Sequence, residues 1–102
     1  PDWQDVETLI KELVKFIKTQ INPVELAARA HYKFERIHPF VDGNGRVGRL
    51  IINQILWHNG YPMLIIEYKK RRSYYNALRR GEDKFVAYFM RRYLSVHKKR
   101  IS

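Results

Sequence analysis

Apolar residues recur every three or four positions along most of this chain, and proline or glycine interrupts the pattern at a few separate points. This period predicts amphipathic α-helices, because side chains three and four apart share a helix face. The interruptions lie near Pro23, Pro39, Gly60 and Gly81. Proline and glycine are typical of the places where helices begin and end. The sequence therefore predicts an all-α fold.

Two helices are expected before the first long break. The first should cover residues 3–20, where apolar residues follow the helical period. Asn22 should cap the second, because asparagine accepts hydrogen bonds from the free N–H groups of a helix start and Pro23 fits the first turn. That helix should run to about Arg36, and residues 37–43 should form a loop, because Pro39 disfavours helical geometry at the residue before it.

Three more helices are expected after the loop. One should begin near Asn44 and end at a cap on Gly60, followed by a short apolar run over residues 63–66 that forms a buried linker or a small strand. Another should cover residues 72–80 and end at Gly81. The last should pack one apolar stripe into the core, formed by Phe85, Tyr88, Phe89, Tyr93 and Val96.

Length and composition indicate a single domain over residues 1–102. The chain contains no cysteine, which excludes disulfides and thiolate metal sites and favours a reducing compartment such as the cytoplasm. Its apolar runs are too short and too charged for a membrane span. It starts at Pro1 rather than methionine, which we interpret as the start of a fragment or a processed chain.

Positive charge is concentrated in the last third of the chain. Residues 1–68 carry eight basic and eight acidic side chains, whereas residues 69–102 carry twelve basic and two acidic ones and account for the net charge of +10. Such asymmetry is typical of a contact with nucleic acid or another acidic surface. The alternative is a set of solvated helix faces, or a surface that other segments cover.

Residues 38–49 combine the groups needed to handle phosphates. Gly43, Asn44 and Gly45 lead into a predicted helix, whose first N–H groups and dipole attract anions. Arg46 and Arg49 share a helix face there, and guanidinium groups bind phosphate oxygens in a bidentate way. Taken alone, the glycines also fit an ordinary turn and the arginines fit surface ion pairs.

Three other side chains in this stretch complete the set. Asp42 is its only carboxylate, which could bind Mg²⁺ beside phosphates or cap the next helix. An imidazole titrates near pH ~6.5, so His38 could take a proton from an attacking hydroxyl. Phe40 is expected to anchor the loop in the core. The stretch therefore predicts chemistry on the phosphates of a nucleotide.

The stretch resembles the signature of the Fic family, H-x-F-x-(D/E)-G-N-G-R-x-x-R. Every specified position is matched, by His38, Phe40, Asp42, Gly43, Asn44, Gly45, Arg46 and Arg49. The resemblance extends over roughly residues 2–96, through the entry to the helix before the loop, the Gly60-Tyr61-Pro62 turn and the Tyr74-Tyr75 pair. It implies a Fic-type core of about five helices in which the active-site loop leads into a central helix.

This resemblance also implies an enzyme that transfers AMP from ATP to a Ser, Thr or Tyr hydroxyl of a target protein and releases pyrophosphate. His38 would be the general base and Asp42 would hold Mg²⁺. Arg46 would bind the β-phosphate and act in catalysis, and Arg49 would bind the γ-phosphate. The backbone of residues 43–45 (Gly43, Asn44 and Gly45) would form the anion hole.

Other features of the family set further expectations. Tyr75, with Asn76, would line the adenine pocket. Gly43 and Gly45 resemble the AMP-transferring members, because the kinase branch has a bulkier residue and a lysine at these positions. The family's upstream β-hairpin flap and inhibitory helix are not recognisable in this chain, so an inhibitory segment or antitoxin-like partner would lie outside it.

Two alternatives remain at this stage. The chain could be a non-catalytic nucleotide- or nucleic-acid-binding module that uses its basic last third. It could instead bind a metal through His31, Glu35 and His38, because the first two residues lie one helical turn apart.

Overall fold

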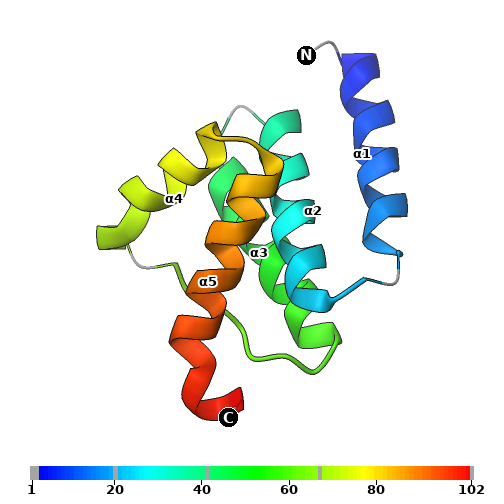
Figure 1. The fold of residues 1–102 in the computed structure, drawn as a ribbon. Coiled ribbons are helices and arrows are strands. Elements are labelled where there is room, and N and C mark those ends of the chain that lie inside the picture. The colour runs from blue at the N-terminus through cyan, green and yellow to red at the C-terminus, as the bar shows by residue number, and fades with distance from the viewer. Residues whose placement is uncertain (1–2, 20, 41, 67, 102) are drawn as a thin grey trace.

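The structure is a computed structural model that describes residues 3–19, 21–40, 42–66 and 68–101. Within these ranges the chain forms α-helices and one short 3₁₀ helix, without strands (Figure 1). The helices are α1 (Trp3–Ile17), α2 (Pro23–Ile37), α3 (Asn44–His58), η1 (Tyr68–Lys70), α4 (Arg71–Arg79) and α5 (Glu82–Ile101). The prediction of an all-α fold is confirmed.

Helix α2 lies at the centre of the packing. It contacts α1, α3 and α5, and Figure 1 shows α1 and α4 at opposite edges of the molecule. Three alanines on α2, Ala27, Ala28 and Ala30, are completely buried. Their small side chains let the neighbouring helices approach closely, and α3 is thereby fixed against the helix that ends at His38.

The start of α2 is capped as the sequence predicts. The side chain of Asn22 accepts hydrogen bonds from the N–H groups of Val24 at 2.9 Å and Glu25 at 3.2 Å. Such a cap stabilises a helix by about 0.5–2 kcal/mol. It satisfies two of the N–H groups that have no partner within the helix.

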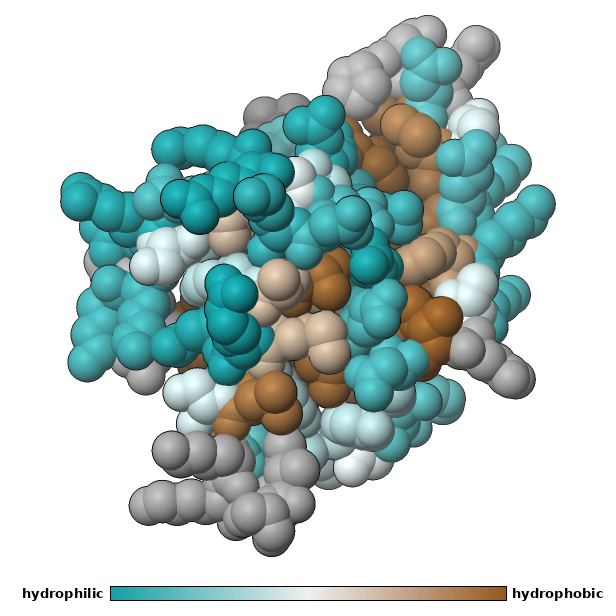
Figure 2. Space-filling model, in the orientation of Figure 1, coloured by the Kyte–Doolittle hydropathy of each residue, from teal (hydrophilic) through white to brown (hydrophobic). Residues whose placement is uncertain are grey.

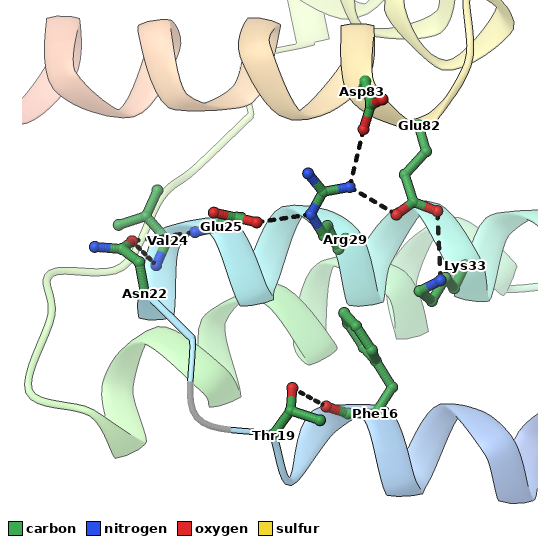
Figure 3. A network of polar contacts seen from close by, with 9 residues as sticks. All are labelled: Phe16, Thr19, Asn22, Val24, Glu25, Arg29, Lys33, Glu82 and Asp83. Atoms are coloured by element: carbon green, nitrogen blue, oxygen red, sulfur yellow. Dashed lines mark hydrogen bonds and ion pairs between the residues drawn. The ribbon is translucent and has the colours of Figure 1, made fainter.

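Arg29 connects α2 to the start of α5 (Figure 3). Its guanidinium contacts Glu25 at 2.8 Å within α2, and Glu82 at 2.8 Å and Asp83 at 3.1 Å on α5. Lys33 also pairs with Glu82, at 3.4 Å. These contacts raise the pKa of Arg29, chiefly through the hydrogen bond to Glu25. They turn both acidic residues of α5 towards α2.

One face of α5 fills the core. Phe85, Phe89 and Tyr93 are almost completely buried, as expected, and Tyr88 is half-buried. The expectation for Val96 is wrong, since its side chain is 50% exposed and His97 is buried against Tyr93 instead. His97 continues the four-residue spacing of the buried rings, which places Val96 about a quarter-turn away from the core.

The segment between α3 and η1 is a linker rather than a strand. Gly60 has φ +77°, the left-handed backbone expected where a helix ends. Of the apolar run 63–66, only Leu64 is buried, and its N–H donates to Asn53 Oδ1 at 2.9 Å. The hydroxyl of Tyr93 donates to the Pro62 carbonyl at 2.8 Å and fixes the linker to α5.

None of the helices in the described part of the chain combines the length and apolar content needed to cross a lipid bilayer.

Candidate active site

His38 occupies a strained position directly after α2. Its φ of 48° and ψ of 60° are left-handed, and no other non-glycine residue among those described has a positive φ. This conformation costs about 1–2 kcal/mol for a residue with a side chain. The N–H of His38 donates to the Phe34 carbonyl at 3.0 Å and so closes the helix. The side chain is exposed to solvent. Strain of this kind is concentrated at functional sites, which singles out His38.

The Asn44 side chain holds this loop together. Its Oδ1 accepts from the Phe40 N–H at 3.1 Å, which fixes the orientation of the amide. Its Nδ2 therefore faces the Phe40 carbonyl at 2.7 Å and His38 Nε2 at 3.2 Å. Because the amide nitrogen can only donate, His38 Nε2 accepts and carries its lone pair there. Asn44 is buried, whereas the His38 ring that it contacts is exposed.

Phe40 does not anchor the loop in the way the sequence predicts. Its side chain is 49% exposed. Its ring contacts Phe34 of α2 in a tilted arrangement, with 6.4 Å between the ring centroids. The expectation of a buried anchor is wrong. The backbone of Phe40, held by Asn44, fixes the loop in place of the ring.

The start of α3 presents free backbone donors. Gly43 is the N-cap, with φ +82°, a conformation that favours glycine. Its own N–H donates to Asp42 Oδ1 at 2.8 Å. The N–H groups of Asn44, Gly45 and Arg46 have no acceptor among the described residues. Asp42 thus contacts the N-cap residue and is not itself the N-cap.

Both arginines project from the first two turns of α3 and are exposed. Arg49 folds back towards the helix start, since a Cβ built on Gly45 would lie 3.3 Å from Arg49 Nη1. Arg46 is the third residue of the helix, beside the free N–H groups. One guanidinium group, that of Arg49, therefore lies close to the helix start, and Arg46 belongs to the same first turn.

Behind the loop, α2 and α3 touch at Gly48. A Cβ at this position would lie 2.6 Å from Glu35 Oε1 and 2.7 Å from His31 Cε1, closer than side chains pack. Glu35 is largely buried, and burial raises its pKa, although the nearby His38 and Arg49 lower it. Gly48 thus permits the spacing between the helix that ends at His38 and the helix that carries the arginines.

His31 joins α2 to α4 in the core. It is completely buried, and its Nε2 forms a hydrogen bond with the Tyr74 hydroxyl. Burial lowers the pKa of His31 to about 4, so the ring is neutral at pH 7. Burial likewise raises the pKa of Tyr74 well above its usual value. The ring of His31 also stacks on Phe85 of α5, at 5.7 Å.

The alternative of a metal site at His31, Glu35 and His38 is not supported. Among the described residues, no group of three or more His, Cys, Asp or Glu side chains is arranged to hold a metal ion. His31 Nε2 is engaged by Tyr74, whereas His38 Nε2 faces Asn44 on the loop.

Tyr75 lies on α4 next to the buried Tyr74. Its ring is 51% exposed and packs edge-on against Tyr74 at 5.2 Å between centroids. Together with Asn76 it lines an open hollow of about 610 Å³. The remaining lining residues are basic, namely Lys69, Arg71, Arg72 and Arg79. The hydrogen bond between His31 and Tyr74 fixes the turn of α4 that carries Tyr75.

Sequence reasoning missed three features of this site. It assigned a role to the backbone of Asn44 but not to its side chain. It assigned no role to Gly48, and it did not predict the hydrogen bond between His31 and Tyr74. A glycine inside a predicted helix is a usable signal for close helix packing, which would have identified Gly48. No sequence signal pairs His31 with Tyr74, because they are 43 residues apart.

Comparison with known proteins identifies the family of this chain. The model of the Fic/DOC family matches residues 1–56. "Protein adenylyltransferase Fic" from Drosophila sechellia and from Drosophila melanogaster are each 38% identical over 95 residues, which is 89% of this chain and 19% of theirs. The chain thus spans about a fifth of the length of these curated relatives.

Solved structures share the fold. Fic-1 from C. elegans superimposes with a TM-score of 0.83 at 32% identity, over 98% of this chain and 33% of that one. A Fic domain containing signaling protein from Bacteroides thetaiotaomicron gives 0.81 at 32% identity, over 92% and 45%. The helices, the loop at residues 38–49 and these matches together place the chain in the Fic/DOC family.

Proposed function

We propose that this chain carries the catalytic loop of a protein adenylyltransferase, which transfers AMP from ATP to a hydroxyl of a target protein. The proposal rests on the placement of His38 by Asn44, immediately before a helix start that carries two exposed arginines and N–H groups without an acceptor among the described residues. The name of the Drosophila relatives supports the same activity. A protein target, with Ser, Thr or Tyr as acceptor, follows from this activity.

His38 is the general base in this proposal. Its Nε2 lone pair takes the proton of the target hydroxyl once the Asn44 amide moves aside. The hydroxyl oxygen then forms a bond to the α-phosphorus, and the bond from this phosphorus to the bridging oxygen breaks. Pyrophosphate leaves with that bonding pair, and AMP stays on the protein.

The helix start stabilises the negative charge of the phosphates. The N–H groups of Asn44, Gly45 and Arg46, which have no acceptor in the described part of the chain, lie at the positive end of the α3 dipole. Donors that are fixed before the reaction begins require no reorganisation during it. The N–H of Gly43 donates to Asp42, so we propose that Asn44, Gly45 and Arg46, rather than Gly43, Asn44 and Gly45, supply the donors of the anion hole.

Asp42 fits a magnesium ion that comes with ATP. Its carboxylate is exposed, and Oδ1 accepts from the Gly43 N–H, while Oδ2 has no partner among the residues that the structure describes. Mg²⁺ prefers one or two carboxylates together with phosphate oxygens. When bound there, the ion would neutralise charge on the α- and β-phosphates. Arg46 and Arg49 would hold the β- and γ-phosphates as bidentate partners.

Three further parts of the proposal concern adenine binding, inhibition and location. Tyr75 and Asn76 would hold the adenine, which the half-exposed ring of Tyr75 permits. A glutamate from a segment or partner outside this chain could pair with Arg49 and displace the γ-phosphate. We propose the cytoplasm as the location, in line with the absence of cysteine.

The test is a pair of incubations with Mg²⁺, candidate target proteins and ATP labelled on either the α- or the γ-phosphate. The proposal predicts protein label from the α-position only. Label from the γ-position would assign a kinase instead, and no label together with intact ATP binding would leave a nucleotide-binding module.

A further inference from the structure

We propose that the groove between α4 and α5, which adjoins the adenine pocket proposed above, binds single-stranded nucleic acid as a second activity of this chain. The groove has a volume of about 440 Å³ and is lined by Ser73, Asn76, Ala77, Arg80, Lys84, Ala87, Tyr88 and Arg91. No residue of the loop at 38–49 lines it. Figure 2 shows hydrophilic side chains gathered on the side of the molecule where α4 lies.

The charge of the groove is not neutralised by neighbouring acids. Within the described residues, no ion pair joins Arg80, Lys84 or Arg91 to a carboxylate. The acidic residues of α5, Glu82 and Asp83, are both bound to Arg29 on α2 (Figure 3). Three cations therefore line one groove that has no carboxylate among its lining residues, which creates a concentrated positive potential.

The basic surface continues beyond the groove. The hollow of about 610 Å³ beside Tyr75 shares Asn76 with it, so the two lie next to each other along α4. The charge of this second hollow includes Arg72 and Arg79, which are exposed. A flexible chain of phosphates could follow both, whereas a single phosphate ion would occupy only one.

The kinds of side chain favour nucleic acid over other polyanions. Arginine outnumbers lysine in both hollows, and its planar guanidinium group can form bidentate hydrogen bonds with phosphate oxygens. Each hollow is also lined by a tyrosine, and aromatic rings stack on bases in proteins that bind single strands. Tyr75 is exposed, and Tyr88 is half-buried against Phe85. An acidic peptide would leave these rings unused. A membrane contact would favour apolar side chains that insert, and alanine is the only apolar residue type besides tyrosine in the groove lining.

The experiment measures binding of fluorescein-labelled oligo-uridine and oligo-thymidine by anisotropy, without ATP, over a range of KCl concentrations. The test variant combines Arg80→Gln, Lys84→Gln and Arg91→Gln. The matched control combines Lys11→Gln, Lys15→Gln and Lys18→Gln, which removes the same charge from α1 and the turn after it, at the opposite edge of the molecule (Figure 1). Circular dichroism melting checks that all proteins are folded.

The proposal predicts salt-sensitive binding by the unchanged protein. The groove variant should bind at least about tenfold more weakly at low salt, and its slope of log K against log salt should fall by about 2, because single strands give about 0.7 per phosphate contact. The α1 variant should keep both values. Equal losses in the two variants would overturn the proposal, because they would reflect net charge alone. Binding of poly-glutamate or of vesicles that contain phosphatidylserine, without oligonucleotide binding, would also overturn it.

Discussion

At the scale of single residues, the position of His38 in the site is set mainly by one side chain, that of Asn44. The sequence identifies the chemical groups, because histidine, carboxylate, glycines and arginines follow one another within residues 38–49. It does not show that the Asn44 amide binds both His38 and the backbone of Phe40. Nor does it show the left-handed backbone at His38, since the residue before a proline is expected to be extended.

Asn44→Asp should disrupt the loop with almost no change in volume. A carboxylate keeps the acceptor for the Phe40 N–H but places an oxygen against the Phe40 carbonyl at 2.7 Å and against His38 Nε2. We expect a loss of about 1–3 kcal/mol in the free energy of unfolding and a strong loss of AMP transfer. Denaturant unfolding and label transfer measure the two effects.

Asn53→Asp is the matched control, because among the described residues Asn53 uses its side-chain oxygen alone, which accepts from the Leu64 N–H. An aspartate keeps that hydrogen bond while adding the same charge. If both variants lose equal stability, the donor role of the Asn44 amide is wrong.

Because His31 is buried, we expect the free energy of unfolding to fall in acid. Burial lowers its pKa from 6.5 to about 4 in the folded state. The unfolded chain therefore takes up the proton first, so the contribution of His31 is complete above pH 6.5 and falls between pH 6.5 and 4, by about 3 kcal/mol. Glu35 acts in the opposite sense, because its raised pKa gives stability that is lost as the pH increases.

The control for this prediction is His31→Gln, which can still bond the Tyr74 hydroxyl but does not titrate. The slope of stability against pH, from denaturant unfolding at several pH values, should be smaller in this variant between pH 6.5 and 4. Identical slopes would show that His31 is not the group that couples folding to protons.

At the scale of elements, helix starts and ends follow from local chemistry and are largely predictable. The Asn22 cap and the left-handed Gly60 are found where expected. The first helix, expected over residues 3–20, ends at Ile17. The distance between helices is harder to predict, because it depends on residues such as Gly48 that touch a helix far away in the sequence.

Gly48→Ala should push α2 and α3 apart. Its Cβ would lie within 3 Å of Glu35 and of the His31 ring, and the ring is held by Tyr74 and cannot move easily. We expect a loss of about 1–3 kcal/mol in the free energy of unfolding, as for other overpacked cores. Thermal and denaturant unfolding measure it.

Gly45→Ala is the comparison within the same helix. There the new Cβ meets only the end of the flexible Arg49 side chain, at 3.3 Å. Stability should change little or rise, since alanine favours helix formation over glycine by about 1 kcal/mol. A similar loss in both variants would contradict the idea that Gly48 sets the helix spacing.

At the scale of the whole molecule, the sequence predicts the fold class but not which surfaces remain exposed. Periodicity alone places Leu9 and Val14 on the apolar face of α1, yet both are at least a third exposed, because α1 packs mainly against α2. The uneven charge is visible in the sequence. Its concentration in a groove becomes visible only when Glu82 and Asp83 are seen to bind Arg29.

The most direct test of the account combines two measurements on His38→Ala. ATP affinity is measured by calorimetry with Mg²⁺, and transfer is measured with ATP labelled on the α-phosphate. We expect His38→Ala to abolish transfer. Because His38 is exposed and we assign the phosphates to the start of α3, we expect ATP affinity to change by less than about threefold, which is under 1 kcal/mol. Transfer at the unchanged rate in this variant would contradict the central claim that His38 is the base.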